Sequence, residues 1–199
     1  PDDQVLRTGA IQSSQTLSGR FNELSSSLID VRRDSAAQVK AQVEKVNALA
    51  EQISGYNRQI AAFESSGVTA NDLRDQRDEA VKSLGNLINI TFSESQSGDI
   101  TVLTNGAMLV GKTKAYAMSV EVDTTGGATL RVQGNPNPIV PKSGSIGGLL
   151  QISQSLVPDL LERMNGLAHE FIREANRAHS TGIPATGPFQ SLKGIHSIQ

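Results

Sequence analysis

The chain has 199 residues, of which 37% are hydrophobic and 4% aromatic, and its formal charge at pH 7 is −2. Without a basic excess to neutralise phosphates or an anionic lipid surface, neither nucleic acid nor a membrane is an expected partner. The absence of cysteine excludes disulfides, thiol nucleophiles and cysteine metal sites. The scarcity of large rings favours an elongated protein, in which paired helices bury small aliphatic side chains.

The first predicted element is one long helix. Its apolar residues recur at alternating spacings of about four and three, which places them on one stripe of a helix and predicts a coiled-coil seam. At 1.5 Å per residue, residues 17–63 would span roughly 70 Å, and we expect the helix to begin earlier still. The seam consists of Leu17, Phe21, Leu24, Leu28 and Val31, followed by Val39, Val43, Val46, Ala50, Ile53, Asn57 and Ile60.

A second, shorter helix is predicted after a break at residues 65–67. Thr69 and Asp72 have the form of a capped helix start, and we expect Asp72 to stabilise the first turn through a free amide and the helix dipole. The apolar stripe of this helix ends near residue 88, so the helix can fold back antiparallel onto the end of the first. That stripe consists of Leu73, Ala80, Leu84 and Leu87.

From residue 90 the apolar period changes to two. Ile100 and Val102 alternate with polar neighbours, and turns rich in glycine, asparagine and proline separate the short runs. The same alternation is expected for Ile90 with Phe92 and for Val120 with Val122. Residues 90–142 are therefore predicted to form a small β-rich insertion of about four to six strands that leans on the helices.

A third helix follows the glycines of residues 144–148 and is expected to return along the first. Pro158 cannot donate a backbone hydrogen bond, so it should kink this helix or divide it near Val157. Residues 181–199 show no convincing period and are expected to be loop at the start of a further region. The predicted buried stripe consists of Ile146, Leu149, Ser153, Leu156, Leu160, Met164, Leu167, Phe171 and Ala175.

The fold class predicted from these elements is mainly α with a β insertion: long antiparallel coiled-coil-like helices plus a small β-rich subdomain. Residues 1–89 and 143–180 would form a discontinuous helical rod around the insertion at 90–142. Because the chain starts at Pro1 with neither an initiator methionine nor a signal segment, we expect it to be an excised fragment.

No metal or cofactor site is expected. His169 begins a sequence like the zincin HExxH helix, but Arg173 stands where the second histidine would have to be. The glycines of residues 144–148 lack the lysine of a phosphate-binding loop and are expected to shape a helix start instead.

The densest polar stretch is Asn71–Asp78, which could serve either acid–base catalysis or the stability of a helix. Asp75 and Asp78 could divide acid and base roles, but nothing nearby separates their pKa values. The favoured interpretation is that Arg74 with Asp78, and Asp78 with Lys82, form helical ion pairs, each worth about 0.2–0.5 kcal/mol. No catalytic residue is expected.

The same stretch, which reads NDLRDQRD after a long heptad helix, resembles a segment of the flagellar hook-associated protein 1 family, whose usual residue at position 74 is leucine. Residues 43–60 are similar to that family's helix, with Lys45, Gly55 and Tyr56 as departures. SGSIGGLL at 143–150 and Val157-Pro158 follow in the family's order. After them come Asn176, His179 and Gly182.

The resemblance implies a non-enzymatic axial protein of the bacterial flagellum, exported by the flagellar type III apparatus and extracellular, at the junction between hook and filament. Its implied partners are the hook protein, hook-associated protein 3 and copies of itself. The fragment alone is expected to be monomeric, because it lacks the family's polymerising ends.

The resemblance also suggests roles for the matching residues, as a structural motif or a subunit contact. Asp72 would cap a helix and Leu73 would pack, while Asp75, Gln76 and Arg77 would hold adjacent helices or a neighbouring subunit. The full set is Asn71, Asp72, Leu73, Asp75, Gln76, Arg77, Asp78, Asn176, His179 and Gly182.

Three alternatives stay open on the sequence. Another axial protein, such as flagellin or hook-associated protein 3, shares long coiled-coil helices. A generic coiled-coil adaptor would satisfy the heptads equally well. An enzyme with an unrecognised site would reveal itself by a pocket of converging titratable groups.

Overall fold

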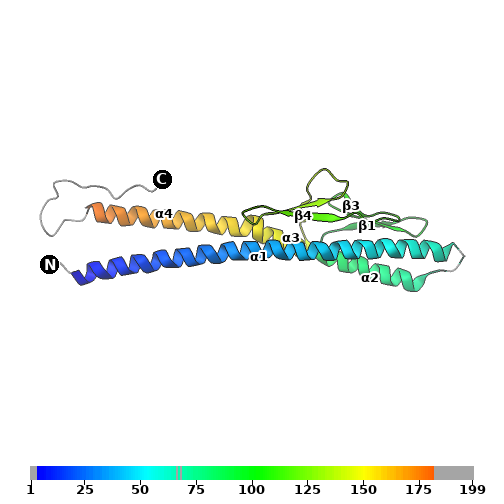
Figure 1. Ribbon diagram of the computed structural model, residues 1–199, viewed down its shortest axis with the longest axis horizontal. Coiled ribbons are helices and arrows are strands. Elements are labelled where there is room, and N and C mark those ends of the chain that lie inside the picture. Colours follow the sequence, from blue (N-terminus) through cyan, green and yellow to red (C-terminus); the bar gives the residue numbers. More distant parts are fainter. Residues whose placement is uncertain (1–3, 66, 68, 182–199) are drawn as a thin grey trace. The chain divides into compact units, whose positions relative to one another are not determined.

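The computed structural model describes residues 4–65, 67 and 69–181, and for residues 4–7 and 178–181 it describes the backbone alone. The fold is mainly α with a β insertion, as predicted (Figure 1). Two helices come first, α1 (Gln4–Glu64) and α2 (Asn71–Leu87). Five strands follow: β1 (Thr91–Glu94), β2 (Ile100–Thr104), β3 (Ala107–Val110), β4 (Met118–Val122) and β5 (Ala128–Val132). The last described elements are α3 (Gly144–Gln151), the π-helix η1 (Ile152–Leu156) and α4 (Val157–Thr181).

The chain divides into two compact units. A helical unit contains the described residues up to Ser27 and from Asp159 onward, and a mixed unit runs from Leu28 to Pro158. All five strands fall inside residues 90–142, but the predicted division into rod and insertion remains a prediction. Thr181 ends α4, and the rest of the predicted loop, 182–199, lies outside the described residues.

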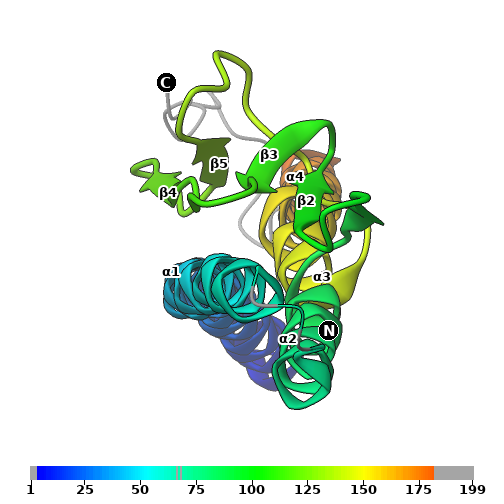
Figure 2. The same cartoon turned by 90° about the vertical axis from the view of Figure 1, so that its right-hand side faces the viewer.

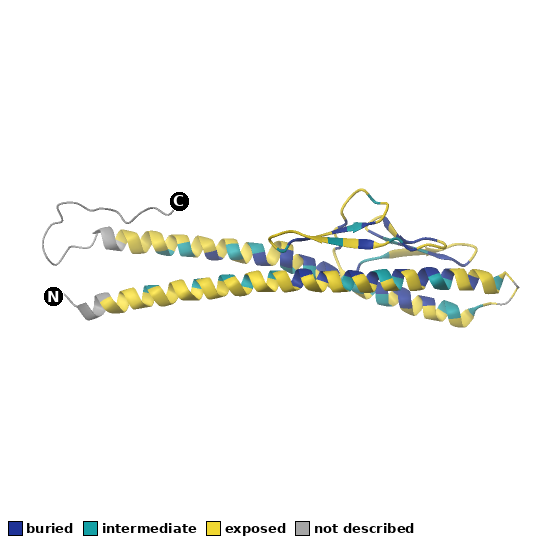
Figure 3. Ribbon diagram, viewed as in Figure 1, coloured by how far each residue is buried: buried dark blue, intermediate teal, exposed yellow. Residues whose placement is uncertain are grey.

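The core of the mixed unit is organised on one stripe of α1. Val39, Val46 and Ile53 recur at heptad spacing and are completely buried. Leu84 of α2 and Ile146 of α3 are completely buried in the same core. Buried residues gather on this stretch of α1, whereas the preceding part of the helix is largely exposed (Figure 3). The second half of the predicted seam is therefore correct.

The strands form two antiparallel sheets, β1-β2-β3 and β4-β5, on the side of α1 opposite α2 (Figures 1 and 2). Ile100 and Val102 of β2 point into the core, which confirms the alternation predicted for them. Ile90 and Val120 are half-buried against the core, but Phe92 and Val122 are 60% and 49% exposed, so the alternation predicted for these two pairs is wrong at the second residue of each. All four residues of β1, an edge strand of its sheet, are exposed.

Two asparagines of α1 bind the strands through side-chain amides. Asn57 accepts the backbone N–H of Ile100 at 3.0 Å and donates to the carbonyl of the same residue at 2.8 Å. Asn47 makes the same pair with Met118, at 2.7 and 2.9 Å. We call each pair an asparagine bridge. Buried backbone groups left without partners would destabilise the fold, so each bridge fixes which strand residue lies over which turn of α1.

Gly144 sets the close approach of α3 to the end of α2. Its φ of +78° lies in the left-handed region, and a Cβ there would stand 2.7 Å from the backbone of Leu87 and Ile88. Only glycine tolerates both conditions. The sequence expectation that these glycines shape a helix start is therefore correct at Gly144.

In the helical unit the predicted stripes are partly wrong. Leu17 and Leu24 of the first seam are 38% and 52% exposed, and Leu160 and Leu167 of α4 are 39% and 64% exposed. Met164 is buried.

Pro158 has the predicted consequence for the helix containing it. The α-helix is divided at Val157, where η1 ends and α4 begins. The π-turn that divides it was not predicted.

Two alanine variants in α4 test this register. Met164→Ala removes a buried side chain and should lower the free energy of unfolding by about 2–5 kcal/mol. Leu167→Ala, three residues later, should change it by no more than about 0.5 kcal/mol, because the side chain is already in water. Urea unfolding followed by circular dichroism measures both, and a larger loss for Leu167→Ala would contradict the observed register.

Candidate functional site

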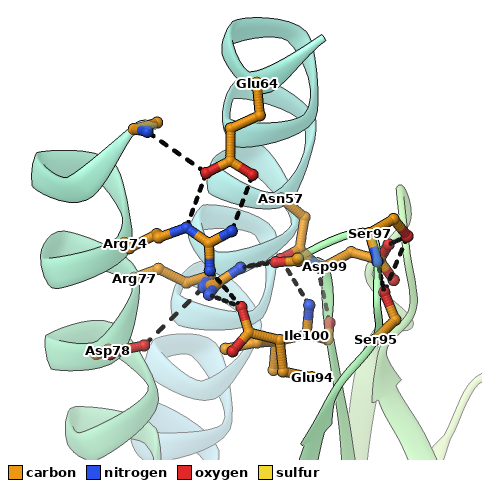
Figure 4. Close-up of polar contacts among 12 residues, drawn as sticks. Asn57, Glu64, Arg74, Arg77, Asp78, Glu94, Ser95, Ser97, Asp99 and Ile100 are labelled. Carbon is orange, nitrogen blue, oxygen red and sulfur yellow. Dashed lines mark hydrogen bonds and ion pairs between the residues drawn. The ribbon is translucent and has the colours of Figure 1, made fainter. Parts of the chain in front are cut away.

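The densest network of side-chain contacts joins the end of α1, the first turns of α2 and the turn between β1 and β2 (Figure 4). We call its five members the polar cluster: Asn57, Glu64, Arg74, Arg77 and Glu94. The heptad helix brings Asn57 and Glu64 to one end of α1, and the short connection places α2 against that end.

Arg77 is the centre of the polar cluster. It is 1% exposed, and its guanidinium donates to Asn57 Oδ1 at 3.3 Å, to the carbonyl oxygen of Gly98 at 2.5 Å and to Glu94 Oε1 at 3.0 Å. Its Nε is buried without a hydrogen bond and lies 4.0 Å from Asp78 Oδ1. A buried arginine is tolerated only when such partners replace its water, so Arg77 ties α2 to both α1 and the β1–β2 turn.

Arg74 holds two carboxylates. Its Nε and Nη2 bind the two oxygens of Glu64 at 2.9 and 2.8 Å, and its Nη1 binds Glu94 Oε1 at 2.6 Å. The hydrogen bond from Arg74 lowers the pKa of Glu64 below its ordinary value, and the same bond raises the pKa of Arg74. This two-pronged geometry is typical of arginine and unavailable to leucine, the residue expected at position 74 from the family resemblance.

A second group of polar contacts lies in the β1–β2 turn. Ser97 Oγ donates to Asp99 Oδ1 at 2.6 Å, and Lys112 Nζ lies 3.3 Å from the same oxygen. These contacts, the serine hydrogen bond foremost, lower the pKa of Asp99. An open groove of about 610 Å³ runs past this turn and is lined by Glu64, Arg74 and residues 94–98.

The charged groups at and beside the groove are paired with one another. Glu64 and Asp99 both have lowered pKa values, so they stay ionised at neutral pH and do not offer a proton. Every nitrogen of the Arg74 guanidinium already binds a carboxylate. Within the described part of the chain, no cluster of three potential metal ligands occurs.

The first turn of α2 differs from the capped start that the sequence predicted. The N-cap is Ala70, with no side-chain capping bond, so the cap predicted at Thr69 is wrong. Glu64, from the preceding helix, accepts the Ala70 N–H at 3.4 Å instead. Asp72 lies in the first turn, where it can still interact with the helix dipole, and Leu73 is half-buried; the roles suggested for both stay predictions.

The outer face of α2 carries Asn71, Asp75, Gln76 and Asp78, all exposed. Asp75 and Gln76 therefore do not hold an adjacent helix within the described chain, and their contact with a neighbouring subunit stays a prediction. The ion pair predicted between Arg74 and Asp78 does not form, because Arg74 binds Glu64 and Glu94 instead.

Lys82, the other predicted partner of Asp78, lies 3.6 Å from Glu79 instead.

Asn176 is exposed on α4 and belongs to the helical unit, so it is not part of the polar cluster. His179 belongs to α4, but its side chain is not described, and Gly182 lies outside the described residues.

Sequence reasoning missed the roles of Glu64, Glu94 and the two bridging asparagines. A signal existed for Asn57, which occupies a seam position between apolar residues and therefore requires a buried partner. No local signal existed for Glu94, whose partners are on another element.

Comparison with known proteins decides the family. A family model described as the flagellar hook-associated protein FlgK helical domain matches residues 1–191. The chain belongs to the FlgK helical domain family.

Two proteins named flagellar hook-associated protein 1 are similar along most of the chain. The one from Bacillus subtilis (strain 168) is 25% identical over 216 residues, covering 94% of this chain and 43% of its own length. The one from Escherichia coli (strain K12) is 27% identical over 197 residues, covering 94% of this chain and 36% of its own length. The chain thus spans less than half of these relatives.

A solved structure agrees with the assignment to the FlgK family. The flagellar hook junction protein FlgK from Burkholderia pseudomallei superimposes with a TM-score of 0.65 at 27% identity, covering 75% of this chain and 29% of that one.

Among the helices that the structure describes, none has the length and apolar character that crossing a bilayer requires.

Arg77→Met tests the centre of the polar cluster. The variant leaves Asn57, Glu94 and the Gly98 carbonyl without their donor, so the free energy of unfolding should fall by about 3–5 kcal/mol. Lys82→Met is the matched control on the same helix; its side chain is 73% exposed, and it should cost no more than about 0.5 kcal/mol. Equal effects of the two variants in chemical denaturation would contradict the role of Arg77.

Acid should weaken the contact between Arg74 and Glu64. Because the folded-state pKa of Glu64 is lowered from 4.5, the contact stabilises the fold fully above that value and is lost as the pH falls through the lower folded value. Arg74→Leu should therefore lower the free energy of unfolding at pH 7, and the difference from the parent protein should shrink below about pH 4. A difference that stays constant across this range would show that Arg74 acts through packing alone.

Proposed function

We propose that the chain is the helical part of a flagellar axial protein that joins hook to filament, and that it carries no catalytic activity. The observation that carries the proposal is the family match over residues 1–191, which includes both the helices and the strands between them. The relatives are named flagellar hook-associated protein 1 and flagellar hook junction protein, which supports the same role.

The polar cluster suits a protein that has to resist bending. Arg77 and Asn57 are buried and bind three elements at once, so bending of α1 relative to α2 would break several hydrogen bonds together. The ionised Glu64 and Asp99 are paired and have no proton to transfer at neutral pH, which favours a structural over an enzymatic role.

The partners proposed are the hook protein, hook-associated protein 3 and further copies of the same protein, and the proposed location is the extracellular flagellum, reached through the flagellar type III apparatus. Leu17, Leu24 and Leu167 are exposed on the helical unit, and neighbouring subunits would cover them in the assembly. That the chain alone is monomeric stays a prediction.

Complementation in the source bacterium tests the function with the full-length protein. Deleting its gene should leave hooks without filaments and release flagellin into the medium, and the parent gene and the Lys82→Met gene should both restore filaments. The Arg77→Met gene should restore few or none, since its helices are no longer tied together. Electron microscopy and an immunoblot of the medium give the readout. Normal filaments in the deletion strain would overturn the proposed function.

A further inference from the structure

The helix that contains Pro158 has an unusual hydrogen-bond pattern. Val157 donates its N–H to the carbonyl of Ile152, five residues back, instead of to Ser153, four residues back. In an α-helical pattern the ring of Pro158 would meet the carbonyl of Gln154, and the π-turn is one way to relieve that clash.

This pattern leaves the carbonyl of Ser153 without a main-chain donor. In the π pattern its partner would be the N–H of residue 158, but that residue is proline, and in the α pattern its partner would be Val157, whose N–H is already used. Arg32 of α1 supplies the missing donor, because its Nε lies 2.8 Å from the Ser153 oxygen. Ser153 itself is completely buried, so water cannot readily take the place of Arg32.

The β4–β5 hairpin fixes the other side of the turn. The side chain of Gln154 donates to the carbonyl of Ala128. Gly126, at the hairpin tip, has a φ of +85°, and a Cβ there would lie 3.3 Å from Arg32 Cγ, so the hairpin lies directly against the Arg32 side chain. Arg32 is thus held between the hairpin and the π-turn.

The apolar residues around the turn fit two registers. In the observed register Val157 is 2% exposed, while the apolar side chain of Leu156 is 51% exposed. An ordinary amphipathic helix places polar residues on its exposed face. One residue corresponds to a rotation of about 100°, so returning η1 to an α-helix would turn Leu156 toward the buried position that Val157 now occupies.

We propose that η1 is a register-setting turn, in which Pro158 and Arg32 together hold the π-turn and so keep Val157 buried and Leu156 exposed. Without the proline no ring meets the Gln154 carbonyl in the α pattern, and without Arg32 the π-turn contains a buried carbonyl that lacks a donor. Either change favours the α register. The inference concerns the fold of this chain and does not depend on the proposed function.

Cysteine labelling tests the proposal directly, because the natural chain contains no cysteine. Leu156→Cys and Val157→Cys are made one at a time in the parent chain, in Pro158→Ala and in Arg32→Gln, and the rate of reaction with a maleimide is measured for each. In the parent, the cysteine at position 156 should react faster than the one at position 157. In Pro158→Ala the order of the two rates should reverse, and in Arg32→Gln it should shift in the same direction.

Arg33→Gln is the matched control, since Arg33 is the next residue of α1 and its side chain is 74% exposed. It should leave the order of rates as in the parent, and a reversal there would overturn the specific role of Arg32. Pro158→Ala introduces a better helix former and should fold, so it decides the outcome even if Arg32→Gln unfolds. If position 156 still reacts faster in Pro158→Ala, packing rather than the proline sets the π-turn, and the proposal is wrong.

Discussion

The asparagine bridges are the interaction on which the rest of the mixed unit depends. A long helix offers the same apolar stripe at every second turn, so apolar contacts alone do not decide which strand residue lies over which turn. Asn47 and Asn57 remove that freedom, because each pairs with both backbone groups of a single strand residue. α1 therefore acts as a template that positions β4 and β2 separately.

The polar cluster extends one of these bridges. Asn57 Oδ1 accepts from the backbone of Ile100 and from Arg77, so the residue that positions the sheet also positions α2. Glu94 Oε1 then accepts hydrogen bonds from both Arg77 and Arg74. The helices α1 and α2 and the first sheet are therefore held by a few polar atoms. Any alternative packing that left one of these atoms buried without a partner would be less stable.

Much of the fold could be predicted from the sequence, because the decisive patterns are local. The heptad stripe predicted α1, the break near residue 67 predicted the start of α2, and the change of period near residue 90 predicted the strands. The site was less predictable. Asn57 was visible as a polar residue in the seam, but its partners Ile100 and Arg77 come from elements whose placement no local pattern specifies.

The buried stripe predicted for the last helix is only partly correct. Periodicity assumes a uniform α-helix, and the π-turn before Pro158 interrupts it. Leu160 and Leu167 are exposed although they continue the apolar pattern, whereas Met164 of the same stripe is buried. The expected ion pairs failed similarly, since helical spacing cannot reveal that Arg74 has better-placed acceptors on α1 and β1.

Hydrogen exchange of two backbone amides tests the bridging role of the asparagines most directly. Replacing Asn57 with leucine keeps a side chain of similar size at the seam position but removes both hydrogen bonds to Ile100. The Ile100 amide should then exchange much faster, whereas the Met118 amide, bound by Asn47, should keep its protection. Unchanged protection of Ile100, or equal loss at both amides, would contradict the claim that each asparagine positions its own sheet on α1.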